Sequence, residues 1–251
     1  MPDLFSLQKL ALEAAAQTAK TLLAGADRTV NFLSAQDVKL QADTDSERVI
    51  REQLAPTGLP VIGEELGGDP ALFDGDALYW VVDPLDGTYN YLRDQPSTCV
   101  SIALMRGREP LCGVVHDFCG GRVYAGVVGA GVSINGTALK PQWAEKTENA
   151  CLMTGFPAGA DKSPEALALF TTRVRRFKKI RMIGSAALAA AYVGVGQADV
   201  YHEEFTNLWD VAAGLALVRA AGGFYSLKPT GAQPLSFTVW AAGKKEWLGD
   251  V

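Results

Sequence analysis

The stretch Trp80-Val81-Val82-Asp83-Pro84-Leu85-Asp86-Gly87-Thr88 decides how this chain is interpreted, because an apolar strand runs directly into two carboxylates spaced three residues apart. Asp83 closes a segment without charge from Ala77 onward, where a lone buried carboxylate would be costly. Asp86 precedes Gly87, a common turn signal. Two anionic ligands at the tip of a rigid strand suit a hard cation such as Mg²⁺, which commonly shares its site with phosphate. The segment therefore indicates metal-assisted phosphate chemistry.

The composition is that of a globular protein with a sizeable core. The chain has 251 residues, of which 48% are hydrophobic, enough for one large domain or two small ones. A net charge of -5 argues against general nucleic-acid binding, although bound cations can reverse the local field for an anionic substrate. We find no run approaching the ~20 apolar residues of a membrane span, and no basic signal-peptide start. We therefore expect a soluble cytoplasmic protein without nucleic-acid or membrane partners.

The cysteines and histidines limit the available chemistry. The four cysteines form no C-x-x-C pair, which disfavours a zinc site, and we interpret them as small buried side chains in a reducing compartment. The two histidines, His116 and His202, exclude a mechanism built on several imidazoles. A structural role is expected for each of them.

The first segment, residues 1–145, is predicted to form helices followed by a mostly antiparallel sheet. Leu4 to Ala24 has the apolar spacing of an amphipathic helix. A second helix is predicted to begin near Thr44, because Thr44-Asp45-Ser46-Glu47 fits a capping box. Residues 59–62 should form a strand that delivers Gly63-Glu64-Glu65, and 78–82 a central strand that is apolar on both faces. Further strands are predicted at 98–105, 113–116 and 122–128, with tight turns at 120–121 and 135–136.

The second segment, residues 146–251, mixes predicted strands and helices. Ser163-Pro164 and Ser185 are predicted to begin helices as N-cap residues. Residues 210–221 are apolar nearly all round, which predicts a buried helix. Strands are expected at 151–154, 198–202, 224–227 and 237–242. We expect the two segments to pack tightly, with the main metal site in the first and further site residues, Asp210 among them, in the second.

Four acids stand at the ends of apolar elements: Glu64, Asp83, Asp86 and Asp210. Several have an ordinary explanation, since Glu64 can end a solvated strand, Asp86 can form a turn and Asp210 can cap a helix. If the fold brings the four together, they repel one another unless cations bind between them. Two ions about 3.5–4 Å apart are a common arrangement in phosphatases.

Thr88 and Gly87 acquire roles beside such a metal centre. The Thr88 hydroxyl can orient a water molecule. The backbone N–H groups of Gly87 and Thr88 can bind a phosphate at the start of a helix.

Five motifs of this chain resemble those of a known family and occur in the same order along the sequence. Asp83–Thr88 looks like the D-P-[IL]-D-G-T signature of the inositol monophosphatase family, and Trp209–Gly214 resembles its second signature, W-D-x-A-[AG]-[GA]. Gly63–Glu65 is similar to its G-E-E motif. Asp37–Asp43 resembles its D-x-x-T-x-x-D segment, and Gly184–Leu188 its G-S/T-A-A-L helix start. The resemblance runs from about residue 37 to about residue 223.

The resemblance implies a fold and an activity. The expected fold is α/β, a layered αβαβα sandwich of the inositol monophosphatase and fructose-1,6-bisphosphatase type, usually paired as a homodimer. The expected activity is a Mg²⁺-dependent, lithium-sensitive phosphomonoesterase that uses a metal-activated water.

The resemblance also implies the metal ligands, with two or three Mg²⁺ ions per site. Glu64, Asp83 and the Leu85 carbonyl would hold the first ion. Asp83, Asp86 and Asp210 would hold the second. Asp43 would orient a water or support a third, weaker ion.

Catalytic and substrate-binding roles follow from the same resemblance. Glu64 and Thr88 would activate the nucleophilic water, together with Asp43. Ala186 and Glu203 would line the place where the family binds the hydroxyl groups of its substrate. The expected substrate-binding residues are Asp86, Gly87, Thr88, Ser185, Ala186, Glu203 and Asp210.

One residue departs from the family pattern, and two further features are interpreted beside it. Leu40 stands where many relatives have threonine, which should alter packing or a hydrogen bond behind the ligands. Strand alternation would turn Glu65 away from Glu64, which leaves the role of Glu65 open. The basic stretch from Arg173 to Arg181 is interpreted as a solvated helix end, with a rim that attracts anionic substrate as the alternative.

The sequence therefore predicts hydrolysis of a small phosphorylated metabolite, with inositol monophosphate as the first candidate. Glu203 favours a polyol ester modestly. The same chemistry on fructose 1,6-bisphosphate, 3′-phosphoadenosine phosphate, histidinol phosphate or NADP is the alternative within the class. A non-catalytic phosphate-binding protein on the same fold is the remote alternative.

Overall fold

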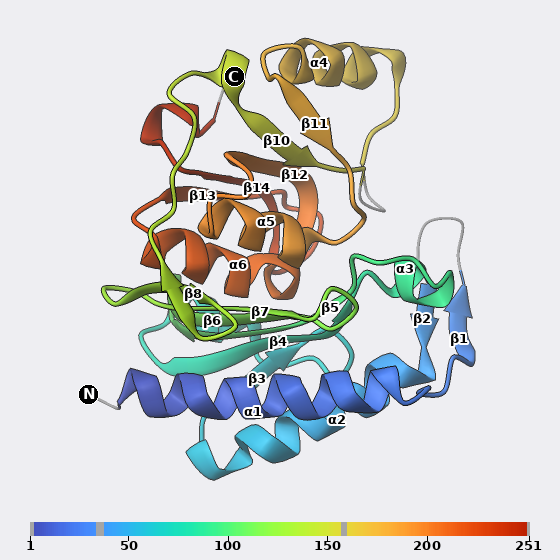
Figure 1. Cartoon of the computed structure of the whole chain (residues 1–251). Coiled ribbons are helices and arrows are strands. Elements are labelled where there is room, and N and C mark those ends of the chain that lie inside the picture. The colour runs from blue at the N-terminus through green and yellow to red at the C-terminus, as the bar shows by residue number, and fades with distance from the viewer. Residues whose placement is uncertain (1–2, 34–37, 157–159, 250–251) are drawn as a thin grey trace.

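The protein is layered, with helices and sheets alternating from one side to the other (Figure 1). The computed structural model describes residues 3–33, 38–156 and 160–249. Asp37, the first residue of the D-x-x-T-x-x-D-like segment, lies outside these ranges. The order of layers is the pair α1 and α2, a large sheet, the pair α5 and α6, a small sheet, and α4. This is the predicted αβαβα sandwich.

The large sheet has seven strands, and its neighbours follow the order of the chain. The first strand pairs with the second in parallel, and every later pair is antiparallel, as predicted. Helices cover both faces of β4, which explains its continuous apolar sequence. The strands are β3 (Val61–Gly63), β4 (Leu78–Asp86), β5 (Cys99–Arg106), β6 (Glu109–Asp117), β7 (Arg122–Val127), β8 (Gly131–Ile134) and β9 (Thr137–Leu139).

The small sheet has five strands in the order β11-β10-β12-β14-β13. Strand β10 pairs in parallel with β11 and β12, whereas β14 pairs antiparallel with β12 and β13. Two more strands, β1 (Val30–Leu33) and β2 (Val38–Leu40), form an antiparallel pair beside α3. The small-sheet strands are β10 (Cys151–Thr154), β11 (Lys179–Arg181), β12 (Val200–Asn207), β13 (Phe224–Pro229) and β14 (Ser236–Ala242).

The helices divide the core into two main layers. One cluster of buried side chains lies between α1, α2 and the large sheet, and a second lies where α5 and α6 separate the two sheets. Gly214 allows the backbone of α6 to approach Ala190 of α5 closely, because any Cβ there would overlap the Ala190 side chain. The helices are α1 (Leu4–Leu23), α2 (Gln41–Leu54), α3 (Thr88–Leu92), α4 (Pro164–Val174), α5 (Ala186–Gly194) and α6 (Leu208–Ala220).

The predicted start of α2 was wrong by three residues. The helix begins at Gln41, and its N-cap is Leu40. The capping interaction comes from Asp43, whose Oδ2 accepts a hydrogen bond from the Leu40 N–H at 2.7 Å. Thr44 therefore lies inside the first turn. The sequence pattern was misleading because an acid at the third helical position can cap a helix without a polar N-cap side chain.

Two further expectations need correction. Strand β4 is second in its sheet rather than central, because the short strand β3 lies at the edge. The basic stretch from Arg173 to Arg181 is not one helix end, since α4 stops at Val174 and β11 begins at Lys179. The predicted N-caps at Ser163 and Ser185 are confirmed.

The division into segments 1–145 and 146–251 stays a prediction. The large sheet ends at Leu139 and the small sheet begins at Cys151. However, α6 comes from the second segment and packs directly on the large sheet. None of the helices within the described ranges has both the length and the apolar character needed to cross a bilayer.

Candidate metal centre and active site

Strand β4 ends in a bulge that turns two acids toward the same side of the sheet. Asp83 pairs with Ser101 of β5, and Asp86 pairs with Cys99, so three steps on β4 match two steps on its partner. Residues three apart on a regular strand point to opposite faces, but the extra residue of a bulge restores a common face. The bulge therefore allows two acids three residues apart to lie on one face of the sheet.

Glu64 reaches the same place from the neighbouring strand. Strand β3 runs parallel to β4, with Gly63 beside Val82, so the residues that follow, Glu64 and Asp83, emerge at the same edge. A tight turn follows, in which the Gly63 N–H donates to the Gly67 carbonyl at 3.0 Å. This turn fixes where the Glu64 side chain begins.

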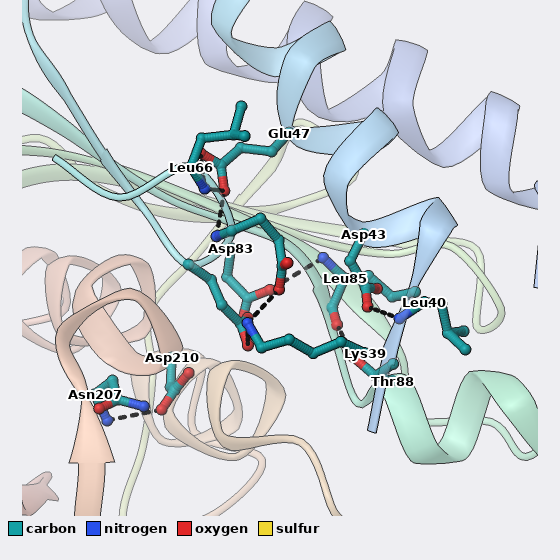
Figure 2. Close-up of polar contacts among 12 residues, drawn as sticks. Lys39, Leu40, Asp43, Glu47, Leu66, Asp83, Leu85, Thr88, Asn207 and Asp210 are labelled. Carbon is teal, nitrogen blue, oxygen red and sulfur yellow. Dashed lines mark hydrogen bonds and ion pairs between the residues drawn. The ribbon is translucent and has the colours of Figure 1, made fainter. Parts of the chain in front are cut away.

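Asp210 comes from α6, in a distant part of the sequence. It occupies the third position of the helix, and its Oδ2 accepts a hydrogen bond from the N–H of the N-cap residue Asn207 at 2.7 Å (Figure 2). Helix capping thus accounts for one oxygen of Asp210. One carboxylate oxygen of Asp210 also belongs to the acidic cluster with Glu64 and Asp83.

The three acids converge. One carboxylate oxygen from each of Glu64, Asp83 and Asp210 lies within 4.8 Å of the other two. The pKa of Glu64 is raised well above its usual value, mainly because the group is desolvated and secondly because the negative charge of Asp210 lies nearby. The pKa of Asp83 is also raised well above its usual value. Desolvation is the main cause, and the negative charges of Glu64, Asp86 and Asp210 add to it.

This cluster fits a hard divalent cation. Its donors are carboxylate oxygens, the ligand type suited to Mg²⁺, Mn²⁺ or Ca²⁺. Three carboxylates this close cannot all ionise at low cost unless a positive charge lies between them. The donor chemistry and the mutual repulsion therefore point to the same ligand class.

Asp86 is held differently. Desolvation raises its pKa, and hydrogen bonds partly offset this rise, the largest from the Ser185 hydroxyl. The Ala187 N–H donates to the same Oδ2 atom at 2.8 Å. Ser185 also caps α5 by accepting from the Leu188 N–H at 3.3 Å. The start of α5 is thus attached to the end of β4 through Asp86.

The turn after β4 positions Thr88. Gly87 has φ 86°, and a Cβ there would lie 2.6 Å from the Ser97 carbonyl oxygen, so the turn requires glycine. The Thr88 hydroxyl donates to the Leu85 carbonyl at 3.0 Å (Figure 2). The proposed Leu85 carbonyl ligand and the Thr88 hydroxyl are therefore direct neighbours.

Two of the predicted site residues, Glu203 and Asp43, interact electrostatically with the acidic cluster. Desolvation, followed by the charges of Asp86 and Asp210, raises the pKa of Glu203 to about 8. Asp43 is buried at the start of α2, and its charge also raises the pKa of Glu64. Ala186 is the first residue of α5, directly after Ser185.

Two residues that were not predicted from the sequence, Glu47 and Lys39, contact the turn after β3 at Glu64 and Glu65. Glu47 is fully buried, and its carboxylate accepts the Glu65 N–H at 2.7 Å. Lys39 places its Nζ 2.6 Å from Glu65 Oε1 and 3.8 Å from Glu64 Oε1. The available signals were a charged residue next to the buried Leu40 and an acid inside an amphipathic helix. The Lys39 contact also gives Glu65 a defined partner.

The remaining two features behave as structural elements. Leu40 is completely buried in the core beneath α1 and α2, and as the N-cap of α2 it offers no side-chain oxygen for a capping hydrogen bond. Within the basic stretch, Arg173 pairs with Glu204 at 3.5 Å, whereas Arg175 and Arg176 are exposed after the end of α4.

An αβαβα sandwich with acids converging from two strands and a helix defines a class of metal-dependent hydrolases. The family model of the inositol monophosphatase family matches residues 3–247. The chain belongs to this family, and it is a phosphoric monoester hydrolase. The family is metal-dependent and acts on small phosphorylated substrates.

Similar proteins of known name agree with this assignment. The Nus factor SuhB of Xylella fastidiosa is 38% identical over 194 residues, covering 76% of this chain and 69% of that protein. The inositol-1-monophosphatase of Mycobacterium bovis is 35% identical over 211 residues, covering 80% and 72%. The fructose-1,6-bisphosphatase/inositol-1-monophosphatase of Aquifex aeolicus is 31% identical, covering 84% and 78%.

Solved structures show the same fold. The inositol monophosphatase from Anabaena sp. aligns with a TM-score of 0.80 at 28% identity, covering 96% of this chain and 91% of that one. SuhB from Mycobacterium tuberculosis aligns with a TM-score of 0.79 at 28% identity, covering 97% and 93%. The predicted fold class and family are confirmed.

Proposed function

We propose that this protein hydrolyses a small phosphate monoester with Mg²⁺ as cofactor, and that inositol monophosphate is its first candidate substrate. The observation that carries the proposal is the convergence of Glu64, Asp83 and Asp210 within 4.8 Å. These acids come from two adjacent strands and a distant helix, so their meeting is a property of the fold. Surface acids scattered by chance would not share desolvation and mutual repulsion.

The chain supplies ligands for two ions. The Leu85 carbonyl would join Glu64 and Asp83 on one ion, and Asp83, Asp86 and Asp210 would hold the other. Bound divalent cations supply positive charge to the phosphate and lower the pKa of a coordinated water. Asp86 keeps its orientation because Ser185 and Ala187 donate to its Oδ2.

The residues around the ions would divide the remaining work. Glu64 would accept a proton from the attacking water, and the Thr88 hydroxyl, already directed at the Leu85 carbonyl, would orient that water. The N–H groups of Gly87 and Thr88 would bind phosphate oxygens. Asp43 would hold a water at the start of α2.

Glu203 supports a polyhydroxylated leaving group. It lies near Asp86 and Asp210, where a carboxylate can accept hydrogen bonds from sugar or inositol hydroxyls. Ala186, small and at the first turn of α5, would leave room for the ring. The names of relatives called inositol-1-monophosphatase support the same candidate substrate, although one relative's name also includes fructose-1,6-bisphosphatase.

A substrate panel tests the proposal. Phosphate release would be measured with inositol 1-phosphate, fructose 1,6-bisphosphate, 3′-phosphoadenosine phosphate, histidinol phosphate and NADP, each with Mg²⁺ and with a chelator. We expect the highest kcat/KM on inositol 1-phosphate and no turnover with the chelator. Preference for another ester would change the substrate but keep the chemistry. Turnover that ignores the chelator would refute the metal-dependent mechanism.

Lithium sensitivity and homodimer formation complete the proposal. Both rest on family membership. Inhibition by LiCl in the substrate assay tests the first, and sedimentation of the purified chain tests the second.

A further inference from the structure

A lysine ammonium lies beside the acidic site, in contact with Glu64 and Glu65. Lys39 extends from β2 toward the carboxylates (Figure 2), with its Nζ 2.6 Å from Glu65 Oε1 and 3.8 Å from Glu64 Oε1. The Glu65 side chain is 8% exposed and the Lys39 side chain 31%, so the contact is partly shielded from water. Shielded pairs at this distance interact more strongly than exposed surface pairs.

The backbone around Lys39 fixes this placement. Leu40, the next residue, is fully buried in the core beneath α1 and α2, and its N–H donates to Asp43 at 2.7 Å. Lys39 pairs with Phe32 across the β1–β2 ladder. Adjacent residues in a strand point to opposite sides, so burial of Leu40 directs Lys39 away from the core and toward the site.

The acids near Lys39 form the side of the site where a third cation would be expected. Glu64 faces the Asp83 and Asp210 carboxylates, while Glu65 and Asp43 contribute further negative charge beside it. A divalent ion bound to Glu64 on this side would lie within a few ångströms of the Lys39 ammonium. Like charges at that distance repel, and Lys39 already engages the Glu65 carboxylate.

We propose that Lys39 takes the place of a third divalent cation, so that this protein binds two divalent ions per chain. This inference rests on the metal-dependent part of the proposed function. The ammonium supplies one positive charge to the Glu64–Glu65 side, and the two ions occupy the positions around Asp83, Asp86 and Asp210. Lys39 is thus a positioning residue for the metal centre.

Counting bound ions tests this inference without substrate or turnover. Chelator-stripped full-length protein would be titrated with Mn²⁺, and free Mn²⁺ would be measured by electron paramagnetic resonance after equilibrium dialysis. We expect two bound ions in the wild type, three in Lys39→Met with the third the weakest, and two in Lys39→Arg, which keeps the charge. Lys39→Gln provides a second neutral replacement if Lys39→Met does not fold.

A matched control comes from Lys9, an exposed lysine that pairs with Glu13 on α1 at 3.8 Å. Lys9→Met removes the same charge far from the site and should leave the count at two. Three ions in the wild type, or two in both neutral Lys39 variants with unchanged affinities, would overturn the Lys39 assignment and leave the proposed function intact. A wild type that binds no Mn²⁺ would overturn the proposed metal chemistry together with this inference.

Discussion

The carboxylate of Glu47 accepts the backbone N–H of Glu65 at 2.7 Å, so a buried acid on α2 holds the turn that presents Glu64. The same carboxylate lies near the Leu66 N–H and pairs with Arg51 Nε at 2.7 Å (Figure 2 shows the Leu66 contact). Glu47 is fully buried, whereas Arg51 is partly exposed. The turn after β3 is therefore braced from behind by α2.

Replacing Glu47 by alanine should damage both stability and activity. The variant leaves the part-buried Glu65 and Leu66 N–H groups without this acceptor and takes the carboxylate partner from Arg51, and an unsatisfied donor of this kind costs about 1–3 kcal/mol. Chemical denaturation measures the loss. Glu47→Gln keeps an acceptor oxygen and should recover a large part of the stability. Equal stability of the alanine variant and the wild type would contradict the bracing role.

Asp83→Asn should stabilise the metal-free protein. An acid whose folded pKa is raised binds its proton more tightly in the folded state, so its contribution to stability falls as pH rises above the unfolded value of about 3.9. At pH 7 the unfolded chain carries Asp83 ionised, so folding has to bury the charge or bind a proton, and a neutral amide removes that cost. Asn Oδ1 can still accept the Leu85 N–H, which lies 3.0 Å from Asp83 Oδ1. Each 1 kcal/mol gained raises Tm by about 2–4 °C.

The same variant should lose activity. Asp83 is the proposed ligand common to both ions, and even residues that merely support metal ligands change activity by about 10–100-fold when removed. We expect a loss beyond that range in phosphate release at saturating Mg²⁺. Mg²⁺ should also raise the Tm of the wild type more than that of Asp83→Asn, because only the wild type keeps the full ligand set. Wild-type turnover in the variant would refute the ligand assignment.

Ser185→Ala should weaken metal binding as well as α5. The hydroxyl caps α5 and donates to Asp86 Oδ2, so its removal costs about 1 kcal/mol for the cap and frees the Asp86 carboxylate to move. Ser163→Ala is the matched control, since Ser163 caps α4 through the Ala166 N–H without contact to Asp86. Both variants should lose stability in thermal unfolding, and Ser185→Ala should lose more because its hydrogen bond to the buried Asp86 is removed as well. Only Ser185→Ala should need more Mg²⁺ for half-maximal activity, and an equal Mg²⁺ requirement would contradict this link.

Sequence patterns predicted most elements because apolar periodicity and capping residues are local signals. Ser163 and Ser185 begin helices as expected, since a serine hydroxyl satisfies a free N–H wherever it occurs. The start of α2 was missed because Asp43 caps it from inside the helix. That arrangement depends on the extended backbone at Leu40, which the residue types do not reveal.

The site was predictable in composition but not in geometry. Family motifs indicated Asp83, Asp86 and Asp210, yet the spacing of Asp83 and Asp86 places them on one face only through the bulge opposite β5. Lys39 could not be assigned to the site from sequence, because its direction depends on burial of Leu40 beneath α1 and α2. Contacts between elements that are distant in the sequence thus determine the side-chain directions that local patterns do not predict.

His202 should make the protein less stable in mild acid. It is buried against Trp240, with ring centroids 3.9 Å apart, and its Nδ1 lies 2.9 Å from the Val239 carbonyl. Desolvation lowers its pKa below 6.5, and the nearby Arg173 charge adds to this, while Glu204 opposes it. Between the folded pKa and 6.5, the unfolded chain binds more protons than the folded chain. Stability therefore falls as pH drops below 6.5, by at most about 1.4 kcal/mol per pH unit.

The comparison of wild type with His202→Gln isolates this effect. Denaturant unfolding at pH 7.5 and 5.5, both with chelator, gives the change in unfolding free energy for each protein. The acids of the metal centre titrate in both proteins, so their contribution cancels when the two changes in unfolding free energy are subtracted. We expect the wild type to lose more stability than the variant between the two pH values, because glutamine does not titrate. Equal losses would mean that His202 carries its proton in the folded protein as readily as in the unfolded chain.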